Sequence, residues 1–292
     1  MRKLTAPDAV TLGYLGAVTA IVLAFRPAGT GIFLAYHALV FALVALLVYA
    51  HGRYGGRFWT FLRHWYVLVL AMAAFREIHY LVPRIHPFAD RRCDLALGAL
   101  DRSLLGDVDG FCLSLANPLL IDVLHLCYWF YFASILIPAA VLYARGELDR
   151  ARQYAGVILA GLYLSYLGYF AVPAVGPHHF FPSRPPELDG WILGRHLHAA
   201  ILSLEWEMPD AFPSGHTLVS LLVLIMSWRL HRRSFWLLLG PASGCIAATV
   251  MLRYHYAIDL AGSLALLPAA LWLGTALHRR LEGAAVPAPQ KR

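Results

Sequence analysis

The chain has 292 residues, of which 60% are hydrophobic and only 14% are charged, and its mean hydropathy is +0.61. This composition excludes an ordinary soluble domain, in which about 25% of the residues are charged. The formal net charge of +7 comes from basic residues scattered over several loops, without the single basic stripe that nucleic-acid binding requires, so nucleic acid is not expected as a partner. The sequence predicts an all-α, polytopic membrane helix bundle in contact with the lipid bilayer.

Apolar stretches long enough to cross a bilayer recur along the whole chain. A hydrocarbon core of about 30 Å requires about 20 apolar residues in a helical span. Eight stretches qualify, at 9–25, 31–50, 64–82, 118–144, 154–172, 213–230, 235–252 and 257–277. We therefore expect six to eight transmembrane helices in a single domain over residues 1–282, followed by a disordered, Gly-, Pro- and Ala-rich tail at 283–292.

Basic residues fall on one side of this eight-helix arrangement. Lys and Arg concentrate in short loops on the cytoplasmic side of membrane proteins. The residues concerned are Arg2, Lys3, Arg53, Arg57, Arg63, Arg145, Arg150, Arg152, Arg232, Arg233, Arg279, Arg280, Lys291 and Arg292. We expect both termini and the tail to be cytoplasmic, and segments 83–117 and 173–212 to be extracytoplasmic.

The third predicted span carries Arg76, Glu77 and His79 in apolar surroundings. Charged groups at membrane depth are costly and usually face the bundle interior or an aqueous cavity. We expect a structural polar bridge here rather than a substrate site. The next segment, 84–110, alternates charged and apolar residues, which is typical of an amphipathic helix lying on the outer leaflet.

Two short motifs open spans on the same predicted side of the membrane. Pro213–His216 (PSGH) begins the sixth span, and His255–Asp259 (HYAID) begins the eighth. The chain crosses the membrane twice between them, so His216 and His255 are expected to meet in one pocket. His255 and Asp259 are four residues apart and share a helix face.

This pair of motifs suits phosphoryl transfer. A carboxylate that accepts the Nδ1 proton of His255 would fix the tautomer and leave Nε2 with a lone pair for nucleophilic attack. His216 lies at a helix start, where backbone N–H groups and the helix dipole attract phosphate, and could act as general acid and then general base. The expected intermediate is a phosphohistidine.

The same residues resemble the second and third motifs of the type 2 phosphatidic acid phosphatase superfamily, which comprises metal-independent lipid phosphatases and phosphotransferases. The resemblance implies that His255 is the nucleophile, Asp259 its partner and His216 the acid and base. It further implies that Ser214 and Gly215 contact phosphate, that neither metal nor cofactor is needed, and that the active site is extracytoplasmic.

Two further segments are similar to one branch of this superfamily. RYHYAIDLAG at 253–262 and CDLALGALDRSLLGD at 93–107 resemble inositol phosphorylceramide synthases, and the motif pair is also similar to that of sphingomyelin synthases. The resemblance covers roughly residues 76–265 and is strong only in the two motifs, and the motif core of the domain is expected at about 154–277. It implies a membrane lipid as substrate.

The chain departs from the superfamily's phosphatases at two positions. Phosphatases usually carry a Lys seven residues before an Arg-Pro pair, but Pro177 precedes Arg184 here, and they carry an Arg six residues before the nucleophilic His, where this chain has Thr249. Other groups must then balance the phosphoryl charge. The candidates are Arg253, Arg184, His178 and His179.

These observations favour a lipid phosphotransferase that moves a phospho-head group to a lipid or polyol hydroxyl. A lipid phosphate phosphatase, acting on phosphatidic acid-like or prenyl phosphate substrates, is the alternative. More remote alternatives are a haem protein using His37, His79 and His125, and a divalent-metal site formed by His216, His255 and Asp259. The sequence indicates neither the donor, the acceptor nor the oligomeric state.

Overall fold

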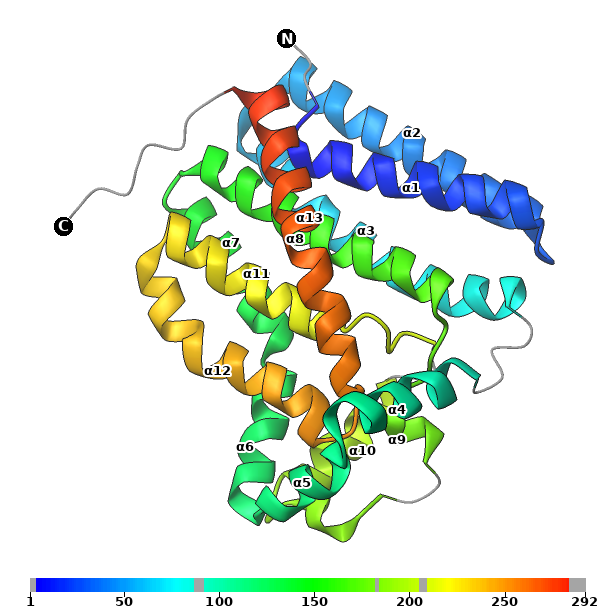
Figure 1. Ribbon diagram of the computed structural model, residues 1–292. Helices are drawn as coiled ribbons and strands as arrows, with labels where there is room; N and C mark the ends of the chain where they lie inside the picture. The colour runs from blue at the N-terminus through cyan, green and yellow to red at the C-terminus, as the bar shows by residue number, and fades with distance from the viewer. Residues whose placement is uncertain (1–3, 87–91, 182–183, 205–208, 284–292) are drawn as a thin grey trace.

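The computed structural model describes residues 4–86, 92–181, 184–204 and 209–283, which form a helical bundle without strands (Figure 1). The predicted tail lies, from residue 284 onward, outside the described residues. The α-helices are α1 Ala6–Phe25, α2 Thr30–Tyr54, α3 Gly56–Ile85, α4 Arg92–Leu105, α5 Val108–Leu115, α6 Pro118–Trp129, α7 Tyr131–Ala144, α8 Leu148–Ala171, α9 Pro177–Phe180, α10 Gly194–Leu204, α11 Gly215–Leu230, α12 Arg232–Met251 and α13 Ala257–Glu282. A short 3₁₀ helix, η1, spans Pro186–Asp189.

Among the described helices, six are long and apolar enough to cross a membrane: α1, α2, α3, α8, α12 and α13. The number rises to seven if α5 and α6, which are bent by 112° to each other, count as one span. Helices α7 and α11 are apolar but have only 14 and 16 residues. The prediction of an all-α bundle with six to eight spans is confirmed, although the stretch 118–144 divides at Phe130 into α6 and α7.

Helix α8 is the centre of the bundle. It packs against α1, α3, α7, α11 and α13, and it is the most deeply buried of the candidate spans. Helix α13 lies close to α8 at Gly274, where an added Cβ atom would lie 2.6 Å from the Cα atom of Val157. The absence of a side chain at Gly274 therefore sets the spacing of the two helices.

The start of α1 and the end of α13 lie at the same end of the bundle. The backbone N–H of Ala6 donates to Glu282 Oε1 at 2.9 Å, and Asp8 accepts hydrogen bonds from Arg63 and Tyr66. In Figure 1 this end lies toward the top of the molecule, whereas α4, α5, α9 and α10 gather at the bottom.

Glu77 of α3 takes part in a structural polar bridge. His37 of α2 lies with Nε2 2.5 Å from Glu77 Oε1 and with Nδ1 2.8 Å from the hydroxyl of Thr19 in α1. Three helices are thus joined by buried hydrogen bonds, which are costly to leave unmade in an apolar surrounding. Glu77 has the structural partner that we expected for it.

The segment that was predicted to lie on the outer leaflet forms α4 and α5 in its described part. Asp101 of α4 accepts the backbone N–H groups of Ala257 and Ile258 at 2.8 and 2.7 Å, so it caps the start of α13. Helix α4 is thereby fixed to the motif that opens α13.

Gly274→Ala should lower the thermal midpoint of the protein in detergent, because the new methyl group must push α13 away from the backbone of α8, at a cost of about 1–3 kcal/mol. Gly240→Ala in α12 is the matched control, since an added Cβ there meets nothing within 4 Å. It should leave the midpoint unchanged or raise it slightly, since Ala is the better helix former. Equal effects of both substitutions would contradict the close approach at Gly274.

Candidate active site

The structure brings His216 and His255 together. Helices α11 and α12 form a hairpin that returns the chain to the start of α13, and the ring centroids of the two histidines lie 5.9 Å apart. Both line a cavity of about 100 Å³, together with Gly215, His178 and Asp210. The rest of its wall is aromatic and aliphatic and comes from α3, α6, α7 and α8 and from Tyr254 in the turn before α13.

His255 has a defined tautomer. Its Nδ1 atom lies 2.8 Å from the carbonyl oxygen of Ala211 and 3.3 Å from Asp259 Oδ2. A carbonyl oxygen only accepts hydrogen bonds, so Nδ1 carries the proton and Nε2 of the neutral ring holds the lone pair. Of the two contacts of Nδ1, the one with the predicted partner Asp259 is therefore the longer, and the one with the carbonyl of Ala211 is the shorter.

Asp259 also stabilises the start of α13. Its Oδ2 atom accepts the backbone N–H of Tyr256 at 2.8 Å, and its side chain is fully buried. Tyr256 is the N-cap of α13 and Asp259 is the third residue of the helix, where a carboxylate satisfies the N–H of the N-cap and interacts favourably with the positive end of the helix dipole. The residue therefore holds both the imidazole of His255 and the turn that carries it.

Hydrogen bonds join the two motifs directly. The N–H of Ser214 donates to the carbonyl of Asp259 at 3.3 Å, and the hydroxyl of Ser263 donates back to the carbonyl of Ser214 at 2.7 Å. The N–H of Ala211 donates to Ala174 O at 2.9 Å, which fixes the carbonyl that holds His255. The distance between the histidines is thus set by backbone contacts.

Ser214 and Gly215 of the PSGH motif have structural roles, one as a helix cap and the other at a close contact. Ser214 Oγ accepts the N–H of Thr217 and caps α11, so this fully buried side chain faces its own helix and does not line the cavity. At Gly215 a Cβ atom would lie 2.7 Å from the hydroxyl oxygen of Tyr169. Gly215 does line the cavity, as predicted for a phosphate contact.

His216 is held between aromatic rings. Its ring stacks on Tyr128 with a centroid distance of 4.5 Å and lies 4.3 Å from the ring of Tyr131. The half-buried side chain follows the first residue of α11 and reaches the cavity from the helix start. This is where an anion would meet the backbone N–H groups of the first turn.

The predicted phosphate ligands divide between three places. His178 lies in the cavity, where burial and neighbouring imidazoles hold its pKa well below the usual range, so it is neutral; His179 packs on its ring at 4.0 Å. Arg253 forms an ion pair with Asp109, and both line a second space, which adjoins the cavity at His255. Arg184 lines neither the cavity of His216 nor this second space. It forms hydrogen bonds with His125 and with the carbonyl of Leu188.

Among the residues of the cavity that sequence reasoning missed are Tyr254 and Asp210. Tyr254 stacks on Tyr128 at 4.3 Å, and its hydroxyl lies 2.9 Å from Nδ1 of His198. Asp210 is half-buried beside His255, and burial raises its pKa to about 6. Asp210 lies three residues before the PSGH motif, but a loop carboxylate carries no spacing signal that would have identified it.

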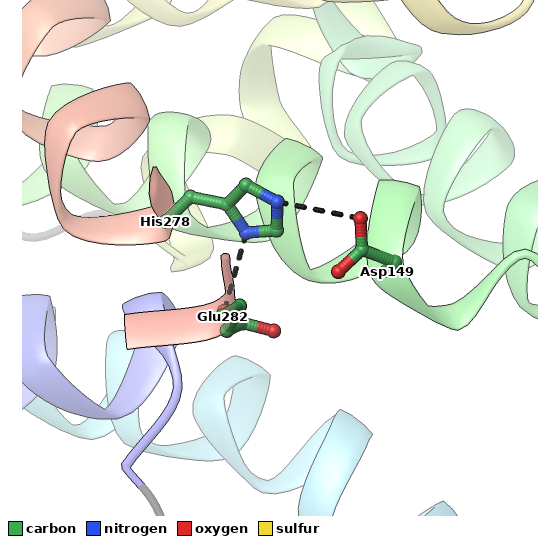
Figure 2. Close-up of side chains that lie close together, drawn as sticks. All are labelled: Asp149, His278 and Glu282. Atoms are coloured by element: carbon green, nitrogen blue, oxygen red, sulfur yellow. Dashed lines mark hydrogen bonds and ion pairs between the residues drawn. The ribbon is translucent and has the colours of Figure 1, made fainter. Parts of the chain in front are cut away.

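Three potential metal ligands do converge in the described residues, but at the other end of the bundle. Figure 2 shows His278 between Asp149 and Glu282, with ring-to-carboxylate distances of 3.5 and 3.2 Å. Glu282 also pairs with Arg152, whose positive charge opposes a cation there. His216, His255 and Asp259, the metal ligands of the alternative hypothesis, do not form such a group.

Comparison with known proteins identifies the family. The sequence profile of the PAP2 superfamily matches residues 95–273, which is more than half of the chain and includes both motifs. The chain belongs to the PAP2 superfamily. It is therefore an enzyme of the phosphatase and phosphotransferase class. No curated protein and no solved structure matches the chain.

The raised pKa of Asp210 in this PAP2 enzyme predicts a pH-dependent stability. The folded-state pKa of about 6 lies above the ordinary value of 3.8, so folding takes up a proton between these values, and stability falls as the pH rises through this window. Asp210→Asn should therefore raise the thermal midpoint by a few degrees at pH 7.5 and leave it unchanged near pH 4. Tryptophan fluorescence during heating measures the midpoint.

Glu187→Gln is the matched control, because Glu187 is exposed on η1 and lines neither the cavity of His216 nor the second space beside His255. It should change the midpoint at neither pH. A lower midpoint for Asp210→Asn at pH 7.5 would mean that the charged form of Asp210 stabilises the fold.

Proposed function

We propose that this enzyme transfers the phospho-head group of a membrane lipid to the hydroxyl of a lipid or polyol through a phosphohistidine, as inositol phosphorylceramide synthases do. One observation carries the proposal: His255, with its proton held on Nδ1, shares a small cavity with His216. Such an arrangement supplies a nucleophile and an acid to the same phosphorus atom.

Two displacements make up the reaction. In the first, Nε2 of His255 attacks phosphorus, the bond from phosphorus to the leaving oxygen breaks, and His216 gives that oxygen its proton. In the second, His216 takes the proton of the acceptor hydroxyl, the acceptor oxygen attacks phosphorus, and the bond to Nε2 breaks. Asp259 and the carbonyl of Ala211 keep the imidazole of His255 oriented throughout.

We place the active site on the extracytoplasmic side, with both termini in the cytoplasm. Arg63, Arg152 and Arg280 surround one pocket beside the start of α1 and the end of α13. His216 and His255 lie at the other ends of α11 and α13. The excess of basic residues on cytoplasmic loops supports this orientation.

Transfer is favoured over hydrolysis because two cations of the phosphatase pattern are missing from the described site. Thr249 takes the place of one and is fully buried, with its hydroxyl donating to the carbonyl of Ile246 in its own helix. Pro177 takes the place of the other and begins α9. Hydrolysis of a lipid phosphate remains the alternative, with water as the acceptor.

Product analysis distinguishes the two reactions. Purified protein in detergent with chelator is offered phosphatidic acid, phosphatidylinositol or phosphatidylglycerol, with and without ceramide or diacylglycerol. The proposal predicts a new phospholipid that forms only when an acceptor is present. Free phosphate released from phosphatidic acid, with no new phospholipid from any donor, would establish the phosphatase alternative.

His255→Ala should abolish the phosphoenzyme and reduce turnover by at least about a thousandfold, because the attacking atom is gone. His216→Ala should reduce turnover by about 10²–10⁴-fold, yet still form the phosphoenzyme slowly from a donor with an activated leaving group. Radiolabelled donor and acid-free gel electrophoresis measure both.

His196→Ala, an exposed histidine of α10, is the control and should retain full activity. A His255→Ala protein with wild-type turnover would eliminate the proposed mechanism.

A further inference from the structure

A further pocket lies at the end of the bundle away from His216 and His255. Its volume is about 450 Å³, within the range of small-ligand sites, and it lies between the start of α1 and the end of α13. Arg63, Arg152 and Arg280 line it, and we call it the arginine pocket. Among the described residues of its wall, Glu282 is the only one with a carboxylate.

Glu282 is already engaged by contacts within the protein. Its Oε1 atom accepts the backbone N–H of Ala6 at 2.9 Å and lies 3.2 Å from Nδ1 of His278 (Figure 2). Its Oε2 atom accepts Nε of Arg152. A guanidinium group has five N–H donors, so Arg152 is held in place through Nε and can donate to a ligand from its other nitrogens.

Side chains decide the charge of the arginine pocket. The first turns of α1, α3 and α8 and the last turns of α2 and α13 meet at its wall, so helix dipoles contribute partial charges of both signs. Arg63 is held by the fully buried Asp8, which does not line the pocket, and Arg280 is exposed in the last turn of α13. Three guanidinium groups against one engaged carboxylate favour an anion, and phosphate matches their geometry.

An apolar space adjoins the arginine pocket. Its volume is about 60 Å³, and it shares His64 and Ala155 with the pocket. The rest of its wall consists of aromatic and aliphatic side chains of α3, α7 and α8, among them Trp65 and Ile135. A ligand that fills both spaces must therefore carry an anionic group beside an apolar part.

This combination favours an acidic lipid. A cation would meet the guanidinium groups, and a neutral lipid would leave them without an anion. Inorganic phosphate has the matching charge, but it cannot fill the apolar space. Basic pockets between membrane-spanning helices are known to bind acidic lipid head groups.

We propose that the arginine pocket binds the phosphate group of an acidic lipid from the leaflet opposite to the active site, with the lipid chain in the apolar space between α3, α7 and α8. The phosphate joins α3, α8 and α13, which supply the three arginines. The lipid is bound there without being converted, so the proposal does not depend on the reaction at His255.

The test measures the thermal midpoint of the full-length protein in detergent with hexadecylphosphonate, whose P–C bond phosphoryl transfer does not cleave. Methylphosphonate supplies the anionic group without the chain, and hexadecanol supplies the chain without the anion. A ligand that binds only the folded protein raises the midpoint. The proposal predicts a rise of about 5 °C with hexadecylphosphonate near saturation, and of less than about 1 °C with either of the other two at the same concentration.

Arg280→Glu tests the arginine pocket, because it places a negative charge in the wall at an exposed position. It should reduce the rise caused by hexadecylphosphonate to about a quarter or less, since like charges repel. Arg279→Glu is the matched control: Arg279 is the exposed neighbour in the same turn and does not line the pocket. It makes the same change in net charge and should keep the full rise.

Ala139→Phe tests the apolar space, because Ala139 lines it and a larger side chain would fill it. It should reduce the rise by about half or more, since a filled space resists a further group. Ala140→Phe, at the exposed neighbouring position outside this wall, should keep the rise. The apolar space also shares Leu68 with the cavity of His216, so His255→Ala serves to separate the two sites. This variant should keep the rise.

Each of the other outcomes would overturn the proposal. Equal losses in Arg279→Glu and Arg280→Glu would mean attraction to the surface charge alone. Loss of the rise in His255→Ala would place the probe in the active site. An equal rise with methylphosphonate would mean that the pocket takes free phosphate, and no rise with hexadecylphosphonate, or a full rise in Ala139→Phe, would exclude the lipid as proposed.

Discussion

The hydrogen bond from Nδ1 of His255 to the carbonyl of Ala211 is the contact on which the site depends. It joins the loop before α11 to the turn before α13, and it leaves Nε2 as the ring atom with the lone pair that the proposed attack on phosphorus requires. The loop is itself held by the N–H of Ala211 on Ala174. Backbone hydrogen bonds of the folded bundle therefore determine which tautomer His255 adopts.

Around this contact the fold separates polar from apolar surroundings. Helix α4, joined to α13 through Asp101, lines a space of about 430 Å³ beside His255 together with Asp109 and Arg253. Helices α3, α6, α7 and α8 form most of the wall of the cavity that His255 shares with His216. A phospholipid has the same division between head group and chain. His255 lies at the boundary of the two spaces, which is where the proposed function requires the phosphorus of a lipid substrate.

The sequence was sufficient to predict that His216 and His255 meet, because two long apolar stretches between two polar motifs leave few other arrangements. It could not predict the role of Ala211, since a backbone carbonyl has no residue-type signal. Nor could it pair Arg253 with Asp109, because the partners are 144 residues apart, one in the turn between α12 and α13 and the other in α5. The division of 118–144 at Phe130 was missed because both halves are apolar.

The most direct test of the double displacement is the stereochemical course at phosphorus. A donor lipid with a chiral phosphorothioate is converted to product by the wild-type enzyme, and the configuration of the product is determined by ³¹P NMR. Each in-line displacement inverts phosphorus, so attack by His255 followed by attack of the acceptor predicts overall retention. Overall inversion would mean that the acceptor attacks the donor directly, and it would contradict the phosphohistidine intermediate.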